Sequence, residues 1–477
     1  MRRTIGILLA LALIVGGVAS WHYGLVDRWL DRDQPSPGAD PVTVAAPDGL
    51  DLPPVTSPPQ VAAAVRSGAL SAAAVRKALA PYLADPDLGR HVLAAVAPLT
   101  GGRPLVEEGS GTAVPASTTK LVTTTAALLA LGPERTFETQ VLRAGPRRVV
   151  LVGGGDPFLE AAQPDEGADT DDTDDGPPYP PRADVADLAA QTAKKLKARG
   201  VRQVRVEYDA GLFTGPSASP QWEPDYVPDG VVSPVTALWV DQGRSPTGFG
   251  RVADPALTAA TAFATALAAA GVKVTGAPTP GTAPESADQV ASVSSAPLGE
   301  IVEQVLQVSD NEASEVLLRH VGIAAGGEAS FAGGRRGVVR TLKAAGVDLT
   351  GATLYDGSGL SRRNSMTPGV LLDVLRLATT RPELGSVVSG LPVAGFTGSL
   401  ALRFEDAPAE GRGRVRAKTG TLTGVSSLAG VVTDLDGNPM LFVLMSDRVA
   451  LVDTLDARDA LDSAAAALGA CHCGAAG

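Results

Sequence analysis

Ser117-Thr-Thr-Lys-Leu-Val-Thr-Thr-Thr-Ala-Ala-Leu-Leu-Ala-Leu131 is the most informative stretch of this 477-residue chain. Pro115 precedes it and Gly132-Pro133 follows it, so the pattern predicts a helix that begins near Ser117 and ends at Gly132. Residues three apart share a helix face, which brings the Lys120 amine beside the Ser117 hydroxyl. Unpaired N–H groups and the positive dipole end at a helix start favour an oxyanion and a lowered pKa for the lysine. The pair suits a nucleophilic serine with a lysine as its base.

A second polar cluster, Ser309-Asp-Asn311, lies between two apolar segments. Residues 301–306 lead into it and residues 312–318 lead out of it, both with helical periodicity, so the cluster occupies a short break between helices. In such a break, hydroxyl and amide groups can point into a cleft. The alternative is a plain N-cap, because Ser, Asp and Asn commonly cap helices.

A third cluster, Lys418-Thr-Gly-Thr421, follows a predicted strand. Residues 412–417 and 425–433 predict paired strands, and residues 439–445 predict a third. Glycine next to a strand indicates close approach of another backbone or a ligand. A sheet edge beside Lys418 would pair an extended peptide and attract its carboxylate, whereas the alternative is a simple turn after a basic strand.

The three clusters, in this order, resemble the S-x-x-K, S-D-N and K-T-G motifs of the serine penicillin-recognising enzymes. Further segments resemble one branch of these, the D-alanyl-D-alanine carboxypeptidase/endopeptidase family, or low-molecular-weight class C penicillin-binding proteins. Those segments are Gly111-Thr-Ala-Val-Pro-Ala-Ser-Thr-Thr-Lys-Leu121, Val152-Gly-Gly-Gly-Asp-Pro157, Pro234-Val-Thr-Ala-Leu238, Asp356-Gly-Ser-Gly-Leu-Ser-Arg362 and Gly413-Arg-Val-Arg-Ala-Lys-Thr-Gly-Thr-Leu-Thr-Gly424. The resemblance covers about residues 65 to 470.

The resemblance implies a serine DD-peptidase that acts through an acyl-enzyme on peptidoglycan stem peptides ending in D-Ala-D-Ala, with β-lactam antibiotics as covalent inhibitors. It assigns Ser117 as nucleophile and Lys120 as its base. Ser309 would relay a proton to the leaving amine and Asn311 would orient the substrate amide. Lys418 would supply positive potential.

The resemblance also implies a substrate-binding strand. Thr419, Gly420 and Thr421 would lie near the terminal carboxylate of the peptide. Backbone N–H groups of Ser117 and Thr421 would form the oxyanion hole. Neither a metal ion nor an organic cofactor is required by this chemistry.

The spacing of the clusters predicts the domain organisation. Ser309 follows Ser117 by 192 residues, more than a compact β-lactamase-like domain needs, and by resemblance the excess is one or more inserted accessory domains. We expect an α/β fold with an antiparallel sheet flanked by helices. The expected parts are catalytic residues 61–145, the insertion 146–295, catalytic residues 296–470 and a tail 471–477.

The N-terminal composition indicates export. Arg2-Arg3 followed by apolar residues 5–19 predicts a signal peptide or membrane anchor over residues 1–20, with its cleavage left open. Residues 21–60 predict a Pro-rich linker. We therefore expect an extracytoplasmic enzyme, with membrane association through the N-terminal segment as an option. Residues 160–181 form an acidic stretch that predicts a solvated loop, with a metal site as the weaker alternative.

Other chemistries find little support in the composition. A net charge of −12 argues against nucleic acid as a partner. Of the four histidines, His91 begins a predicted strand and His320 faces away from Asn311 on a continuous helix, so a Ser-His-Asp triad is disfavoured. Cys471 and Cys473 are the only cysteines, which excludes a disulfide framework and leaves a short disulfide within the tail as an option.

Two alternative functions remain open from the sequence. A β-lactamase would share the acylation chemistry but would need fast deacylation, and no glutamate-bearing loop suited to that task is recognisable. A non-catalytic cell-wall peptide-binding protein is disfavoured because every motif residue is present. The balance of carboxypeptidase and endopeptidase activity, the stem peptide and the oligomeric state stay undetermined.

Overall fold

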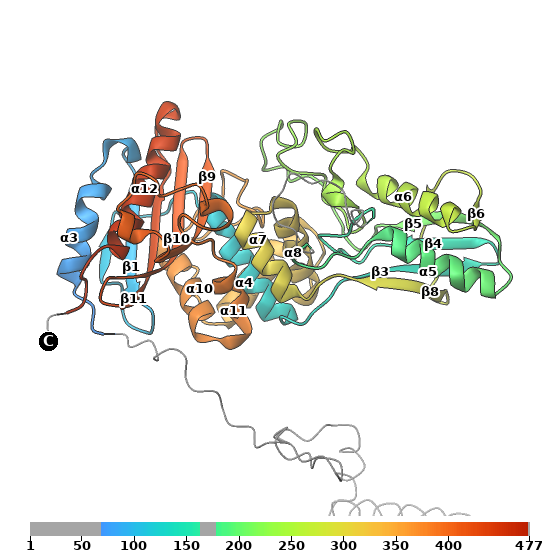
Figure 1. Cartoon of the computed structure of the whole chain (residues 1–477), viewed down its shortest axis with the longest axis horizontal. Coiled ribbons are helices and arrows are strands. Elements are labelled where there is room, and N and C mark those ends of the chain that lie inside the picture. Colours follow the sequence, from blue (N-terminus) through green and yellow to red (C-terminus); the bar gives the residue numbers. More distant parts are fainter. Residues whose placement is uncertain (1–67, 163–177, 476–477) are drawn as a thin grey trace, which may run out of the picture. The chain divides into compact units, whose positions relative to one another are not determined.

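The computed structural model describes residues 68–162 and 178–475 (Figure 1). The predicted signal peptide or anchor over residues 1–20, the linker over residues 21–60 and most of the acidic stretch over residues 160–181 lie outside these residues. No helix within the described part of the chain combines the length and the apolar character needed to cross a membrane.

A five-stranded antiparallel sheet carries the K-T-G motif, as the sequence predicts. Its order is β2 (Val106–Glu108), β1 (Val92–Pro98), β11 (Pro439–Ser446), β10 (Val425–Thr433) and β9 (Val415–Leu422). The first strand of the predicted trio starts three residues later than expected and runs on through Lys418-Thr-Gly-Thr421. The motif therefore lies within edge strand β9 and not in a turn after it.

Helices cover both faces of this sheet (Figure 1). On one face α3 (Ala72–Leu83) and α12 (Thr454–Gly469) pack over Phe442 and Leu444 of β11. On the other face α4 (Thr119–Leu131) and α10 (Pro368–Thr380) pack over Leu441 and Val443. Because β11 is buried on both sides, its sequence is continuously apolar instead of alternating. The remaining helices around α4 are α7 (Leu298–Val308), α8 (Asn311–Ala324), α9 (Phe331–Ala344) and α11 (Gly385–Ser389).

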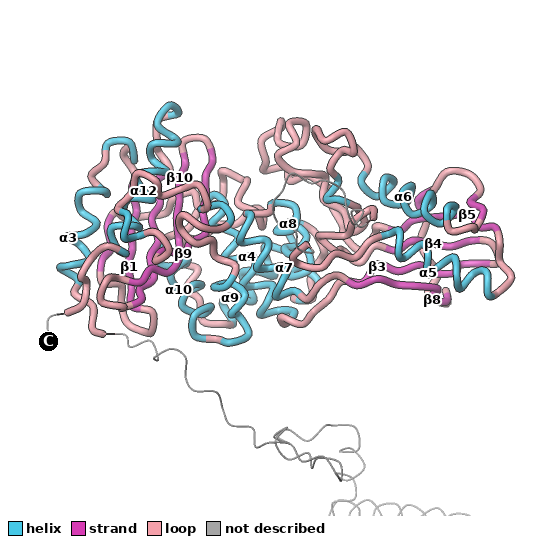
Figure 2. Tube along the Cα trace, in the orientation of Figure 1, coloured by secondary structure: helices cyan, strands magenta, loops and turns pink. Residues whose placement is uncertain are grey.

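A second sheet is built from the residues between α4 and α7. Its order is β6 (Lys273–Val274), β5 (Gln203–Asp209), β4 (Arg148–Val152), β3 (Glu138–Gly145) and β8 (Asp288–Ser294), with β7 (Thr279–Pro280) beside β5. Helices α5 (Val185–Ala198) and α6 (Pro255–Ala269) share its apolar core. Between β5 and α6 the chain is almost entirely loop, interrupted by the short turn η5 (Asp241–Gly243) (Figure 2). The numerical domain bounds stay a prediction.

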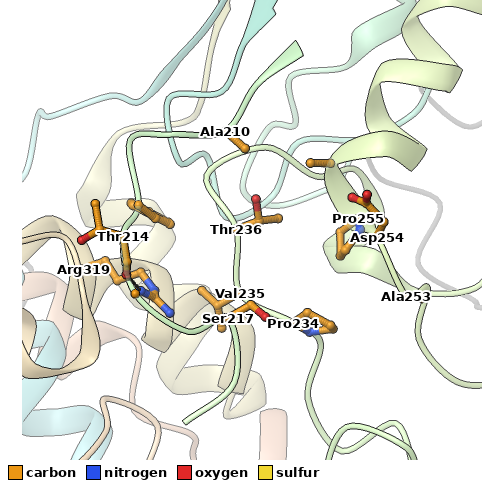
Figure 3. A pocket seen from close by; sticks show the side chains of 13 residues that line it. Ala210, Thr214, Ser217, Pro234, Val235, Thr236, Ala253, Asp254, Pro255 and Arg319 are labelled. Atoms are coloured by element: carbon orange, nitrogen blue, oxygen red, sulfur yellow. Dashed lines mark hydrogen bonds between the residues drawn. The ribbon is translucent and has the colours of Figure 1, made fainter. Parts of the chain in front are cut away.

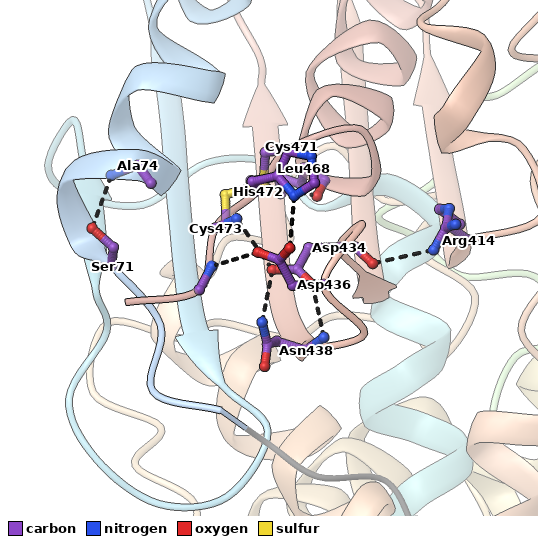
Figure 4. The surroundings of a disulfide bond; sticks show 11 residues. Ser71, Ala74, Arg414, Asp434, Asp436, Asn438, Leu468, Cys471, His472 and Cys473 are labelled. Carbon is purple, nitrogen blue, oxygen red and sulfur yellow. Dashed lines mark hydrogen bonds and ion pairs between the residues drawn. A yellow bond between two sulfur atoms is a disulfide. The ribbon is translucent and has the colours of Figure 1, made fainter. Parts of the chain in front are cut away.

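The C-terminal tail closes onto the first sheet (Figure 4). Cys471 and Cys473 form a disulfide, which is the option that the sequence left open. The Cys473 carbonyl accepts the Ser71 N–H at 2.8 Å, and Asp434 accepts the Cys473 N–H at 3.2 Å. The tail thus fastens the start of the described chain to the turn between β10 and β11.

Candidate active site

The nucleophile candidate Ser117 lies in a tight turn directly before α4. This turn, η4 (Ala116–Thr118), follows Pro115 and places Ala116 at a φ of +47°. Hydroxyls of Thr118 and Ser427 both donate to the Pro115 carbonyl, at 2.7 and 2.6 Å. The turn is therefore held from both sides, so that a strained backbone presents the Ser117 hydroxyl in one position.

Lys120 is the second residue of α4, three residues after Ser117, and lies beside it as the spacing predicts. Its Nζ donates to the Ser117 Oγ at 3.0 Å, to the Asn311 Oδ1 at 2.8 Å and to the Ser358 carbonyl at 2.7 Å. The side chain is fully buried, and this burial lowers the pKa of Lys120 to about 8, although the Glu315 carboxylate acts in the opposite direction. When the amine is neutral, two acceptors still hold its hydrogens and its lone pair is left for the Ser117 hydroxyl.

The Ser309-Asp-Asn311 cluster combines a cap with two inward-facing groups. Asp310 is the N-cap of α8, because its Oδ1 accepts the Ala313 N–H at 2.7 Å, so the N-cap alternative applies to this residue alone. Ser309 adopts the left-handed region with a φ of +61°. Its Oγ accepts a hydrogen bond from Lys418, while the Asn311 Oδ1 accepts one from Lys120.

Lys418 extends from β9 into the same site. Its Nζ donates to the Ser309 Oγ and to the Thr419 carbonyl, both at 2.8 Å. Burial lowers the pKa of Lys418 well below its usual range, and the nearby cations Lys120 and Arg403 lower it further. A buried ammonium with cationic neighbours is an electropositive point at the sheet edge.

The glycine of the K-T-G motif permits close approach between β9 and the nucleophile turn. A Cβ at Gly420 would lie 2.7 Å from the Pro115 carbonyl oxygen and 3.1 Å from the Ser117 nitrogen. Because Gly420 has no side chain, β9 borders the Ser117 N–H directly. Of the neighbouring motif residues, Thr419 forms a hydroxyl–hydroxyl hydrogen bond with Ser399 at 2.9 Å, and Thr421 is exposed.

The structure brings the predicted catalytic side chains into two hydrogen-bonded sets. Ser117, Lys120 and Asn311 form the first set, and Ser309 and Lys418 form the second. Both histidines that the sequence weighed lie elsewhere: His91 pairs with Asp447 at 2.5 Å, and His320 bonds the Gly155 carbonyl at 2.9 Å. Within the described residues, no group of three or more His, Cys, Asp or Glu side chains is arranged to hold a metal ion.

Sequence reasoning missed Glu315, which lies one turn beyond Asn311 on α8. The carboxylate is fully buried and accepts the Ser358 N–H at 2.8 Å and the Gly357 N–H at 3.1 Å. Burial, reinforced by the neighbouring Asp356, raises the pKa of Glu315 to about 7. Glu315 thus positions the loop whose Ser358 carbonyl binds Lys120. The resemblance of residues 356–362 to the family identified the loop that contains Ser358, but it gave no indication that Glu315 binds this loop.

Comparison with known proteins gives consistent matches over most of the chain. The family model for D-Ala-D-Ala carboxypeptidase 3 (S13) matches residues 75–250 and 247–468. A carboxypeptidase of Mycobacterium tuberculosis is 36% identical over 440 residues, covering 90% of this chain and 91% of its own length. Carboxypeptidase DacB of Mycolicibacterium smegmatis is 38% identical over 409 residues, covering 83% and 84%. The crystal structure of penicillin binding protein 4 from Haemophilus influenzae matches with a TM-score of 0.61 and 21% identity, covering 80% of this chain and 93% of that one.

Proposed function

The chain belongs to the D-Ala-D-Ala carboxypeptidase (S13) family and is a hydrolase of the DD-carboxypeptidase type, and we propose that Ser117 is its nucleophile. The observation that carries this proposal is the 3.0 Å contact between the Lys120 Nζ and the Ser117 Oγ inside a buried site. A serine needs an adjacent base to attack an amide, and a lysine whose pKa is lowered to about 8 can act as one near neutral pH.

Acylation begins when neutral Lys120 takes the Ser117 proton and the Ser117 Oγ attacks the carbonyl carbon of the penultimate D-Ala. The resulting oxyanion would accept hydrogen bonds from the N–H groups of Ser117 and Thr421, and the close approach of Gly420 to the Ser117 nitrogen supports this assignment. The absence of a side chain at Gly420 is what lets the strand supply a donor there.

Collapse of the tetrahedral intermediate breaks the C–N bond and requires a proton on the leaving amine. The Ser309 Oγ already accepts a hydrogen bond from Lys418, so its own hydrogen is free to be donated to that amine. Ser309 gives its own hydrogen to the amine, and once bound substrate bridges the two hydrogen-bonded sets it would regain a proton from Lys120, which returns to its neutral form. Water then hydrolyses the ester and releases the shortened peptide.

We assign the terminal carboxylate of the substrate to the side of the cleft formed by Lys418, Thr419 and Thr421. The peptide would run along residues 418–421 of edge strand β9. The first half of the strand is already paired on its outer side, because the Ala394 N–H donates to the Val415 carbonyl and the Ala417 N–H donates to the Pro392 carbonyl, both at 3.0 Å. Peptidoglycan stem peptides ending in D-Ala-D-Ala fit this arrangement, and β-lactams would acylate the same serine. We also propose that the same site acts as an endopeptidase on cross-linked peptides.

The proposed peptidoglycan substrate indicates where in the cell this enzyme works. The relatives include a carboxypeptidase and a penicillin binding protein, and an enzyme that acts on peptidoglycan works outside the cytoplasm. We propose that residues 1–20 export the chain and that they can also anchor it to the membrane.

Mass spectrometry after reaction with penicillin tests the assignment. The adduct should be found on the peptide that contains Ser117, and Ser117→Ala should show no adduct while its melting temperature stays within a few degrees of the wild-type value. Release of D-Ala from an acylated D-Ala-D-Ala peptide should be lost in the same variant. An adduct on any other serine would refute Ser117 as the nucleophile.

A further inference from the structure

One loop of the inserted segment, residues 231–251, contacts each of the three residues that follow Ser309. Asp310 accepts a hydrogen bond from Gln242, and Asn311 donates one to the Val231 carbonyl at 3.3 Å. The next residue, Glu312, is bonded from the same loop. The opposite wall of the cleft is therefore supported by a segment that is remote in sequence from every catalytic motif.

Gln242 makes the most specific of these contacts. Its Nε2 donates to the Asp310 Oδ2 at 2.8 Å, while the Asp310 Oδ1 caps α8. Both oxygens of Asp310 are thus used, one by its own helix and one by the loop. An acid held at both oxygens cannot rotate, so the backbone between α7 and α8 has a single orientation.

The backbone around Gln242 is strained. Asp241, Gln242 and Gly243 all have positive φ, at +52°, +53° and +66°, and two of the three are not glycine. Gln242 is nevertheless only 3% exposed, and its carbonyl accepts the Ser233 hydroxyl at 2.5 Å. Non-glycine residues occupy this region only when surrounding contacts enforce it, and such positions cluster at functional sites.

A second contact holds the start of α8 from the same loop. The Glu312 Oε1 accepts from the Arg251 guanidinium at 2.7 Å and from the Ser233 N–H at 3.2 Å. Both charged side chains are largely buried, at 14% and 5% exposure. Removing one partner of a buried ion pair leaves an uncompensated charge, so this contact holds the loop against the start of α8.

Further along α8, Arg319 binds the neighbouring loop of the insertion (Figure 3). Its guanidinium donates to the Thr214 carbonyl at 3.1 Å and to the Pro216 carbonyl at 2.9 Å. Arg319 and Thr214 border a pocket of about 270 Å³ that is also lined by residues 234–236, which directly follow Ser233. The helix that carries Asn311 is therefore fastened to the insertion at two levels.

From these contacts we infer that Gln242 is a positioning residue for the proton relay, acting through Asp310 on Ser309. This inference rests on the proposed function, because it concerns the step in which Ser309 protonates the leaving amine. Ser309 directly precedes Asp310 and takes its own left-handed conformation from that junction. Loss of the Gln242 contact frees Asp310 and lets the Ser309 hydroxyl move off the Lys418 Nζ and the leaving group.

Two substrates distinguish positioning from general support of the fold. A peptide ending in D-Ala-D-Ala has an amine leaving group that must be protonated, whereas the matched thioester expels a thiolate that needs no proton. In Gln242→Leu, which removes the donor and leaves an apolar side chain that is one atom shorter, kcat/KM should fall about tenfold to a hundredfold for the amide and less than about threefold for the thioester. The loss should be in kcat, with KM little changed. Gln242→Asn, whose amide is one methylene too short to reach Asp310, should behave similarly.

The matched control is Gln191→Leu. Gln191 also donates its amide to a carboxylate, Asp187 at 2.8 Å, but both residues lie on α5, away from the Ser309-Asp-Asn311 cluster. This variant should match wild type on both substrates. Equal losses on amide and thioester in Gln242→Leu, or unchanged amide turnover with a folded protein, would overturn the positioning role. Wild type that cleaves neither substrate would instead overturn the proposed function and this inference with it.

Discussion

The pH dependence of acylation should follow the protonation of Lys120. Only the neutral amine can take the Ser117 proton, so the second-order rate constant for acylation should rise with pH and level off above the pKa of about 8. Below that pH the rate should fall about tenfold per pH unit. The sign follows from burial, which disfavours the charged form and so lowers the pKa of a lysine.

The size of the effect follows from the same shift. With a pKa of about 8, roughly one enzyme molecule in ten carries neutral Lys120 at pH 7. At the usual value of 10.5 this fraction would be about one in three thousand. Burial therefore raises the concentration of the active base about three-hundredfold, which corresponds to roughly 3 kcal/mol.

Fluorescent penicillin provides the assay, because its carboxylate stays ionised between pH 5.5 and 9.5 and the profile then reports the enzyme. Lys120→Arg is the matched variant: its guanidinium keeps the charge and stays protonated, so acylation should be lost by about a thousandfold or more at every pH. A flat wild-type profile from pH 6 to 8, a break above pH 9, or ready acylation of Lys120→Arg would each refute the base assignment.

Three further substitutions test the surroundings of the site. Gly420→Ala should destabilise the fold by about 1–3 kcal/mol in urea unfolding and slow penicillin labelling, because the new Cβ would clash with the Ser427 Oγ and would lie 2.7 Å from the Pro115 carbonyl oxygen, next to the Ser117 turn. Asp462→Ala should cost about 3–5 kcal/mol of unfolding free energy, since it leaves Arg403, now paired at 2.6 Å, as an uncompensated buried charge; an unchanged urea midpoint would contradict this. Lys418→Ala should lower kcat/KM for a D-Ala-D-Ala acid about a hundredfold, and amidation of that peptide should harm wild type far more than the variant. Equal penalties for amidation in both proteins would transfer carboxylate binding to another group.

The sequence predicted the structure most accurately where the arrangement of residues depends on their local spacing. Ser117 and Lys120 are three residues apart, so they lie beside each other even though Ser117 is in the turn η4 and α4 begins at Thr119, and α4 ends at Gly132 as expected. The apolar strands of the first sheet were equally evident. The start of β9 was placed too early because the turn before it contains no residue that excludes a strand, and only pairing with β10 sets its first residue.

Contacts between remote segments could not be predicted. Nothing in the sequence near Gln242 indicates that its amide reaches Asp310, because the pairing depends on how the insertion packs against α8. The same holds for Glu315, whose partners lie about forty residues away on a loop. A glutamate in the middle of a helix usually faces solvent, and only the packed structure shows it beneath the catalytic lysine.

Lys120 and Lys418 have different charged neighbours, and this difference explains why the first acts as a base and the second binds a carboxylate. Four carboxylates surround Lys120, with Glu315 the strongest, and they keep the pKa of this buried amine near 8 instead of lower, where it would be too weak a base. The charged neighbours that act on Lys418 are cations, Lys120 and Arg403, which lower its pKa further. A buried amine facing cations lacks a counter-charge, and a substrate carboxylate supplies one. Binding of that carboxylate should therefore raise the pKa of Lys418 and stabilise its ammonium form, so that the substrate anion supplies the counter-charge that the site lacks.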